Sequence, residues 1–113
     1  MEQYFTDDEL RCKCCEKLVI DLDFRTRLNN ARALAGFAFV VTSGYRCEQH
    51  NQAVGSTSTN HVLGKAADIK CTNGWTRYAI VRAMIEANMM GIGIGNYFIH
   101  CDTNRTDHAI WTY

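Results

Sequence analysis

The middle of the chain reads His61-Val62-Leu63-Gly64-Lys65-Ala66-Ala67-Asp68, and it sets a histidine and an aspartate seven positions apart. On a helix, two residues at this spacing would lie two turns and about 10.5 Å apart along the axis, too far to meet at one ion, so they meet only if a turn precedes an extended run. Gly64 can supply the turn, and residues 66–71 can form the extended run. On these two residues alone, a loop histidine without a ligand is the simpler interpretation, so the rest of the chain has to decide.

Length and composition are those of one globular domain over residues 1–113. The chain is 47% hydrophobic and 21% charged, as in ordinary globular proteins. Twelve basic residues balance twelve acidic ones, so no long-range field draws the chain to nucleic acid or to an anionic membrane. We therefore expect no nucleic-acid partner and no membrane insertion, and we expect a monomer.

The N-terminus, MEQYFTDDEL, is acidic and lacks the basic and apolar regions of a secretory signal. We expect a protein made in the cytoplasm without a signal peptide. In that reducing compartment the six cysteines should be free thiols or metal ligands rather than disulfides. The run Cys12-Lys13-Cys14-Cys15 could contribute to a second metal site, although the other cysteines are isolated and offer no matching pair.

Two amphipathic helices are predicted from apolar residues at three- and four-residue steps. The first covers residues 21–35, with its arginines on a solvated face, and Gly36 ends it. The second covers residues 75–90, after a turn at Asn73-Gly74, and its methionine pair Met89-Met90 should fill core space. The expected core residues are Leu22, Phe24, Leu28, Ala31 and Leu34 or Ala35 in the first helix, and Trp75, Tyr78, Ala79, Met84 or Ile85 and Met89 in the second.

Shorter helices are predicted near the N-terminus and after the first strand. The run Thr6-Asp7-Asp8-Glu9 has the pattern of a capping box, so a helical turn should extend to about Arg11. Residues 47–54 can form a second short helix. The loop that follows, at residues 55–60, is small and polar, leads into His61 and could shape a cleft.

Strands are predicted at residues 37–42, 66–71, 91–95, 97–102 and 108–113. The first is aromatic and β-branched and should be central. The third alternates glycine and isoleucine and should be bulged, with a close backbone approach. The last should be an edge strand.

Alternation of side chains along two of these strands collects polar groups on one face. Asp68 points away from the apolar face of strand 66–71, and His100 and Asp102 share a face with Phe98 in strand 97–102. A buried carboxylate beside an imidazole is costly unless it is paired or bound to an ion. A simple His-Asp hydrogen bond would also satisfy both groups.

If the two strands are neighbours with these faces aligned, a metal site follows. His61, Asp68 and His100 would then form a three-ligand site with an open fourth position, which is typical of catalytic zinc. Water in that position would have its pKa lowered towards ~7 and could act as a nucleophile. Asp102 suits the general base, and Arg46 suits the cation for a developing oxyanion. A structural ion pair or a cap is the alternative role for Arg46.

The order and spacing of these motifs resemble the zinc D-alanyl-D-alanine carboxypeptidase family. The motifs are Ser43-Gly44-Tyr45-Arg46, His50-Asn51, His61-x-x-Gly64-x-Ala66-x-Asp68 and Ile99-His100-Cys101-Asp102. That family includes the D,D-dipeptidases of vancomycin resistance, bacterial peptidoglycan endopeptidases and phage endolysins, and it shares its fold with the hedgehog signalling domain. The resemblance covers nearly the whole chain. It implies an α+β fold of the hedgehog/D,D-peptidase type, with a small central, mainly antiparallel sheet and two main helices packed on it.

The resemblance also implies roles for single residues. One catalytic Zn²⁺ would be held by His61, Asp68 and His100, and Arg46 would bind the substrate carbonyl or carboxylate. The other expected substrate-binding residues are Ser43, Thr59 and Trp111, where Thr59 takes the place of the Ser or Thr that usually lies two residues before the first ligand.

The general base is the point where the chain departs from the family pattern. Many members place Glu, Asp or His a few residues before the third ligand, where this chain has residues 95–97, Gly-Asn-Tyr. Asp102 is therefore the expected base, with His50 and His108 as alternatives. Asp102 could instead orient a ligand.

Peptide bonds next to D-amino acids in bacterial peptidoglycan are the implied substrate, cleaved by a D,D-carboxypeptidase or an endopeptidase. The small size and the lack of a signal look most like a phage or prophage lysis enzyme, which reaches the cell wall through a phage-type lysis route. A non-catalytic zinc-binding domain of the same fold, acting as a binding module, is the alternative because the upstream acid is absent. A thiol-rich module that binds protein or nucleic acid is disfavoured by the zero net charge.

Overall fold

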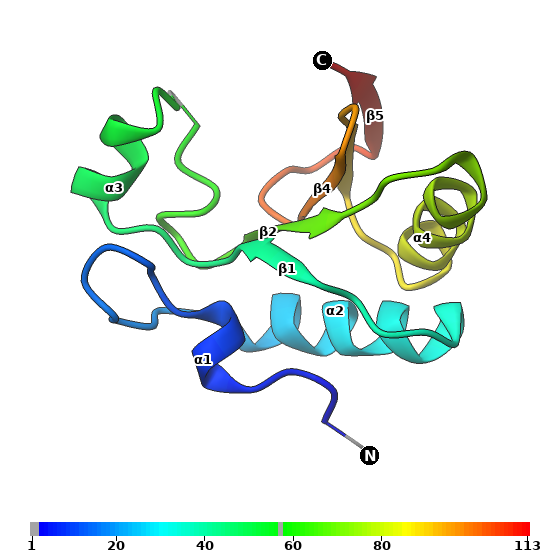
Figure 1. Cartoon of the computed structure of the whole chain (residues 1–113), viewed down its shortest axis with the longest axis horizontal. Coiled ribbons are helices and arrows are strands. Elements are labelled where there is room, and N and C mark those ends of the chain that lie inside the picture. Colours follow the sequence, from blue (N-terminus) through cyan, green and yellow to red (C-terminus); the bar gives the residue numbers. More distant parts are fainter. Residues whose placement is uncertain (1–2, 57) are drawn as a thin grey trace.

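The computed structural model describes residues 3–56 and 58–113, so that Thr57 in the predicted polar loop lies outside the described residues. In chain order, the helices and strands are α1 Asp7–Leu10, α2 Leu22–Ala35, β1 Val41–Ser43, α3 Glu48–Ala53, β2 Ala66–Lys70, α4 Gly74–Glu86, β3 Gly91–Ile94, β4 Phe98–Asp102 and β5 Ala109–Thr112. Two helices begin the chain, helices and strands then alternate from β1 to β3, and two further strands end it (Figure 1).

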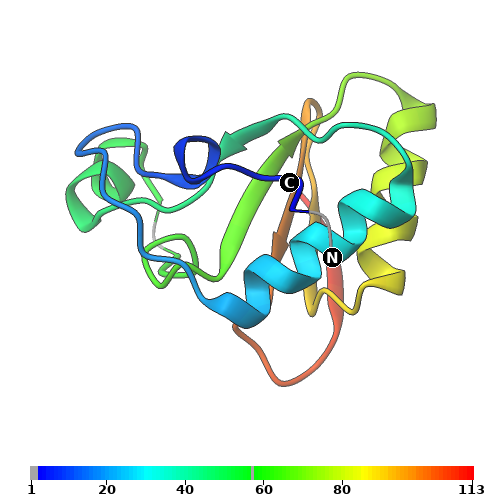
Figure 2. The same cartoon turned by 90° about the horizontal axis from the view of Figure 1, so that it is seen from below.

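The strands form one five-stranded sheet in the order β1-β2-β4-β3-β5. Three of the neighbouring pairs are antiparallel, and β3 pairs with β5 in parallel. The two long helices, α2 and α4, pack against each other and against one face of this sheet, so the predicted α+β class and the mainly antiparallel sheet are confirmed. Figure 2 shows α2 running across the strands with α4 beside it.

The core fills the space between these helices and the sheet. Its strand side chains come from alternate positions, Ala67 and Ile69 in β2 and Ile99 and Cys101 in β4, as the predicted alternation requires. The intervening side chains of the same strands therefore lie on the opposite face, away from α2 and α4. That face carries the polar groups considered below. No helix within the described ranges is both long and apolar enough to cross a membrane.

Helix ends follow the predicted capping signals. The Thr6 hydroxyl accepts a hydrogen bond from the backbone N–H of Glu9 at 3.3 Å, and the Glu9 carboxylate accepts one from the N–H of Thr6 at 3.0 Å, which makes the capping box of α1. Asp21 caps α2 in the same way through the N–H of Phe24. The helix ends at Gly36, whose φ of 79° lies in the left-handed region that glycine adopts without strain.

The buried faces of the two long helices differ in part from the prediction. Leu22 and Leu34 were expected in the core but are 77% and 53% exposed, and Asn29 is buried on α2, where its side-chain oxygen accepts the N–H of Tyr4. Leu22 is the first residue of α2, and Leu34 is the residue before its last. The arginines of α2 do more than face solvent, because Arg25 donates to the carbonyl of Phe5 and to Asp7.

The second long helix is rotated relative to the prediction and is shorter. Trp75 and Tyr78 are 72% and 70% exposed, and the core residues of α4 are Ile80, Ala83 and Met84. The aromatic residues lie in the predicted helix but not on its buried face. Trp75 packs against Phe37 at the edge of the core. The helix ends at Glu86, and the chain reverses through Asn88 at φ 62° before β3 begins. Met89 fills the core as predicted.

Two strand predictions are also corrected. Residues 37–42 were expected to form a central strand, but β1 covers only Val41–Ser43 and lies at the sheet edge. Phe39, before the strand, is buried in the core, and the carbonyl of Val40 still accepts the N–H of Lys70 at 2.8 Å. The glycine-rich strand β3 pairs with β4 without a register shift, so it has no bulge. The close approach is confirmed, since a Cβ at Gly93 would lie 2.7 Å from the Trp111 indole nitrogen. The predicted edge strand, β5, lies at the other sheet edge.

Candidate metal centre

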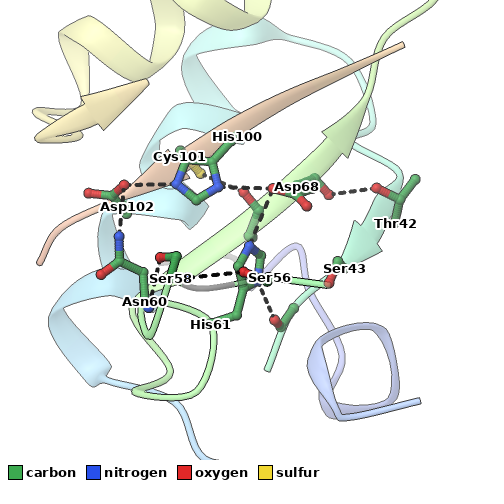
Figure 3. Close-up of polar contacts among 12 residues, drawn as sticks. Thr42, Ser43, Ser56, Ser58, Asn60, His61, Asp68, His100, Cys101 and Asp102 are labelled. Carbon is green, nitrogen blue, oxygen red and sulfur yellow. Dashed lines mark hydrogen bonds and ion pairs between the residues drawn. The ribbon is translucent and has the colours of Figure 1, made fainter. Parts of the chain in front are cut away.

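Asp68 and His100 are direct cross-strand partners on the polar face of the sheet. The register of β2 and β4 sets these two residues opposite each other. Nδ1 of His100 lies 3.0 Å from Oδ1 of Asp68 (Figure 3). The strands of Asp68 and His100 are therefore neighbours with their polar faces aligned, as the proposed metal site requires.

The third residue, His61, comes from the loop before β2. The turn at Gly64, which has a φ of 71°, places His61 over the strand, and its Nδ1 lies 2.7 Å from the carbonyl oxygen of Gly44. A carbonyl only accepts, so Nδ1 carries a proton, and Nε2 is the nitrogen that faces Asp68. This Nε2 lies 3.4 Å from Oδ1 of Asp68.

These three side chains fit a divalent metal ion. His61, Asp68 and His100 each offer one donor atom, and the three atoms lie within 4.8 Å of one another. The second nitrogen of each ring is engaged elsewhere, His61 on Gly44 and His100 on Asp102, which is how ligand histidines are usually held. Two imidazole nitrogens and one carboxylate oxygen are a donor set that zinc accepts, and three protein ligands leave a fourth position open.

Electrostatics couple the three groups. Burial opposes ionisation of Asp68, but the hydrogen bonds and charges of His100 and His61 hold the pKa of its carboxyl well below the usual range. Burial likewise opposes the charging of His100, yet Asp102 and Asp68 raise the pKa of this imidazole. Without a metal ion, His100 therefore favours its protonated form. The positive charge of this imidazolium then balances the carboxylates of Asp68 and Asp102, as a metal ion would.

Asp102 lies behind His100 and is fully buried. Its Oδ2 is 2.8 Å from Nε2 of His100, and it also accepts from Nδ2 of Asn60 at 3.3 Å. Arg105 donates to its Oδ1 at 3.1 Å. Burial opposes ionisation here too, but His100 and Arg105 lower the pKa of Asp102, so it is a carboxylate with three partners.

Arg46 reaches the same cluster from the turn after β1. Its Nη2 lies 3.3 Å from Oδ2 of Asp68, its Nε donates to Oγ of Ser43 at 2.9 Å, and its Nη1 donates to Oδ1 of Asn51 at 3.3 Å. Asn51 is itself held by a bond from its Nδ2 to the carbonyl of Ser58. The guanidinium is therefore fixed beside Asp68.

A cavity of about 520 Å³ opens over these groups. His61, Asp68, His100 and Arg46 all line it. The indole of Trp111 stands against the ring of His100, with centroids 5.6 Å apart, and Tyr113 stands against Phe98 at 5.1 Å. The remaining lining residues are Val54, Gly55, Ser56, Ser58, Asn60 and Arg105.

Some residues predicted for the site lie outside this cavity. Thr59 is exposed and does not line it, and His50 lies in α3 and does not line it either. His108 lies 2.7 Å from the side-chain oxygen of Asn88, where it borders a separate cavity. Ser43 touches the site through Arg46.

The sequence reasoning missed Asn60, Arg105 and Tyr113. Tyr113 could have been found from strand alternation, because it is two residues past Trp111 and therefore on the same face. Arg105 lies three residues past Asp102, in a loop whose return towards β4 no periodicity predicts.

Comparison with known proteins accords with this geometry. No match was found among curated proteins. A family model described as Peptidase M15 matches residues 3–102, which include α1 to β4 and hence the strands and the loop that bring His61, Asp68 and His100 together. Zinc-dependent peptidases make up that family, and the donor set found here suits zinc. With nearly the whole chain matched and the His, Asp and His side chains gathered at one cavity, the protein belongs to the peptidase M15 family of metallopeptidases.

Proposed function

We propose that the protein is a zinc-dependent peptidase that cleaves peptide bonds next to D-amino acids in bacterial peptidoglycan. One observation carries this proposal: three metal donors and a fixed guanidinium meet at the floor of one cavity. The match to the peptidase M15 family supports the same class of reaction. Residues 1–113 would act as one zinc peptidase domain.

His61, Asp68 and His100 would hold the ion. When bound, zinc supplies a Lewis acid that polarises a carbonyl group and lowers the pKa of water towards ~7. Gly44 keeps the proton of His61 on Nδ1, which directs Nε2 to Asp68. In the hydrolysis, a water oxygen bonds to the scissile carbonyl carbon and the C–N bond breaks. One product then carries a new carboxylate, and the leaving nitrogen takes a proton to become an amine.

Arg46 would bind the substrate and stabilise the oxyanion. Its guanidinium is positively charged, borders the cavity and is held by Ser43, Asn51 and Asp68. A donor fixed in place before the reaction stabilises negative charge that develops on the carbonyl oxygen without reorganisation. Ser43 would act through Arg46, whereas Trp111 would form an apolar wall for the peptide.

Asp102 would position His100 for metal binding. Its carboxylate is fully buried, is bonded to His100 Nε2, and does not line the cavity. Such a carboxylate fixes the tautomer of a ligand histidine and raises its basicity. The predicted role of Asp102 as the general base requires direct reach to the water proton, and the zinc affinity of Asp102→Asn distinguishes the two roles.

A non-catalytic zinc-binding module is the second candidate. One observation favours it: among the residues that the structure describes, Asp68 is the single carboxylate that lines the cavity, and it is also a metal donor. A module of this kind would bind peptidoglycan peptides with zinc in place but release no product.

The deciding experiment incubates the purified protein with peptidoglycan and with a peptide ending in D-Ala-D-Ala. We expect new amine groups and fragments in the presence of zinc, loss of both with a chelator, and recovery on adding zinc back. His61→Ala should be inactive, whereas the matched control His108→Ala, altered at a histidine outside the cavity, should stay active. Binding of wall peptides without any chelator-sensitive product would replace the peptidase with the binding module.

The biological setting is proposed on the same basis. A phage-type lysis role predicts that the protein, expressed in a bacterium together with a membrane-permeabilising partner, lyses the cells. A monomer is expected from light scattering at micromolar concentration. Lysis that persists in His61→Ala would show that the cells break for another reason.

A further inference from the structure

A second group of metal-binding side chains lies outside the site described above. The Sγ atoms of Cys12, Cys15 and Cys47 lie within 4.8 Å of one another, although Cys47 follows the other two by more than thirty residues in the chain. Cys12 is buried, Cys47 is half-buried and Cys15 is exposed, and all three are free thiols. The proposed peptidase chemistry uses none of them.

The backbone around Cys12 is shaped for a sulfur that carries negative charge. Its Sγ accepts hydrogen bonds from the N–H groups of Cys14 and Cys47, each at 3.4 Å. The loop closes on itself through the bond from the N–H of Glu16 to the carbonyl of Cys12 at 2.9 Å, and Glu16 has a φ of 62°. This left-handed turn brings the thiols of Cys12 and Cys15, at C-x-x-C spacing, to the same side.

The sulfur of Cys47 also accepts a backbone hydrogen bond, as the sulfur of Cys12 does. The Sγ of Cys47 accepts the N–H of His50 at 3.4 Å. N–H groups that donate to a sulfur stabilise its thiolate form, and several thiolates side by side need a cation to balance their charge.

We propose that Cys12, Cys15 and Cys47 form a second, structural metal site for Zn²⁺. Cys14 lies outside this group of three sulfurs but contacts Cys47, and its side chain would move to supply the fourth donor. Thiolates are soft ligands that select zinc among the abundant divalent ions. Sulfur atoms at ~2.3 Å from a tetrahedral zinc lie about 3.8 Å apart, so donors already within 4.8 Å need only a small adjustment. This proposal does not rest on the peptidase function.

The site would anchor the segment that presents Arg46. Cys47 follows Arg46 directly, and the N–H of Tyr45 donates to the carbonyl of Leu10 at 2.8 Å, two residues before Cys12. Gly44 packs so closely on Leu10 that an added Cβ would lie 2.5 Å from its carbonyl oxygen. A metal ion would therefore link the N-terminal loop to the turn that positions both Arg46 and the carbonyl holding His61.

Cobalt substitution tests the proposal in the full chain. Co²⁺ bound by thiolates gives intense sulfur-to-metal charge-transfer bands in the near ultraviolet, which a site of histidine and aspartate does not give. The reduced, metal-free protein should develop these bands on adding Co²⁺ and lose them on adding Zn²⁺. His100→Ala should keep the bands, which separates this site from the proposed peptidase centre.

Single variants then assign the ligands. Cys12→Ser and Cys47→Ser should lose the bands, and each should bind one metal equivalent less than the wild type by mass spectrometry of the native protein. The matched control Cys71→Ser, altered at a buried cysteine outside the cluster, should keep them. If circular dichroism shows that a serine variant is unfolded, the cobalt spectrum of the wild type still tests the proposal. Absence of the bands from the folded, reduced wild type would overturn the proposal, as would bands that persist in folded Cys47→Ser.

Discussion

The imidazole of His100 lies between two carboxylates, with Nδ1 3.0 Å from Asp68 and Nε2 2.8 Å from the fully buried Asp102. In the proposed zinc site, Nδ1 of His100 would face the metal and Nε2 would be held by Asp102. Strand alternation and the register of β2 against β4 together place all three residues on one face and align them.

Asp102→Asn should weaken zinc binding more than it alters the fold. The amide has nearly the same shape but lacks the negative charge that supports His100, and loss of such a partner typically costs about 10–100-fold in metal affinity. Competition with a chromogenic chelator measures the affinity. Asp107→Asn, at an exposed carboxylate in the loop that follows β4, is the control and should bind zinc as the wild type does. Unchanged affinity with a large fall in kcat would instead make Asp102 the general base.

Arg46→Ala should lower kcat/KM by about 10²–10³-fold, the usual cost of removing one oxyanion donor. Arg46→Lys should recover only part of this loss, because an ammonium group cannot reproduce a guanidinium that contacts Ser43, Asn51 and Asp68 together. Steady-state hydrolysis of a D-Ala-D-Ala peptide measures both. Arg82→Ala, which removes an exposed ion pair with Glu86, should change nothing measurable. Full activity in Arg46→Ala would remove this residue from the mechanism.

Strand patterns predicted this molecule better than helix patterns did. Alternation in β2 and β4 correctly separated Ile69 and Cys101 from Asp68 and His100, because a strand has only two faces and the core takes one of them. Helix faces are broader, and their orientation depends on the partner. Trp75 looked like a core residue from its type, yet tertiary packing turned it outwards.

The parts of the site that could not be predicted come from loops. Asn60 and Arg105 reach Asp102 from segments without periodicity, so only the folded chain reveals that they meet. The same holds for the thiol cluster, because the sequence shows three cysteines near the N-terminus but not that Cys47 closes on them.

The metal-free protein should lose stability as the pH rises from 6 to 8. The pKa of His100 is higher in the folded protein than in the unfolded chain. The contribution of His100 to the free energy of unfolding is therefore fully present below the unfolded pKa of ~6.5 and disappears as the pH rises through the folded pKa. The pKa of Asp68 is lowered, so its contribution is present above ~3.9 and is lost only in stronger acid. Thermal unfolding with a chelator should therefore show the highest Tm between about pH 4 and 6.5.

Zinc should reverse this trend, because a ligand imidazole must be neutral. As the pH rises past the raised pKa of His100, protons cease to compete with the metal and zinc binding strengthens. The gain in Tm on adding zinc should thus grow between pH 6 and 8. The His100→Ala variant should not show the decline without metal, and in a Cys47→Ser background, which removes the proposed thiolate site, it should not show this growth either. A zinc-induced gain that is independent of pH would contradict the assignment of His100 as a ligand.

Gly93→Ala should disturb the cavity wall rather than the fold. A Cβ at this position would lie 2.7 Å from Nε1 of Trp111 and 2.8 Å from Oη of Tyr113, so both side chains must move. Because Trp111 stands against His100, we expect a higher KM for wall peptides, with a stability loss within the ~1–3 kcal/mol usual for overpacking. Gly74→Ala is the matched control, since its Cβ would meet nothing within 4 Å. The control variant should have the same Tm as the wild type or a slightly higher one, and it should keep the wild-type KM. An unchanged KM in Gly93→Ala would mean that substrate does not contact the Trp111 wall.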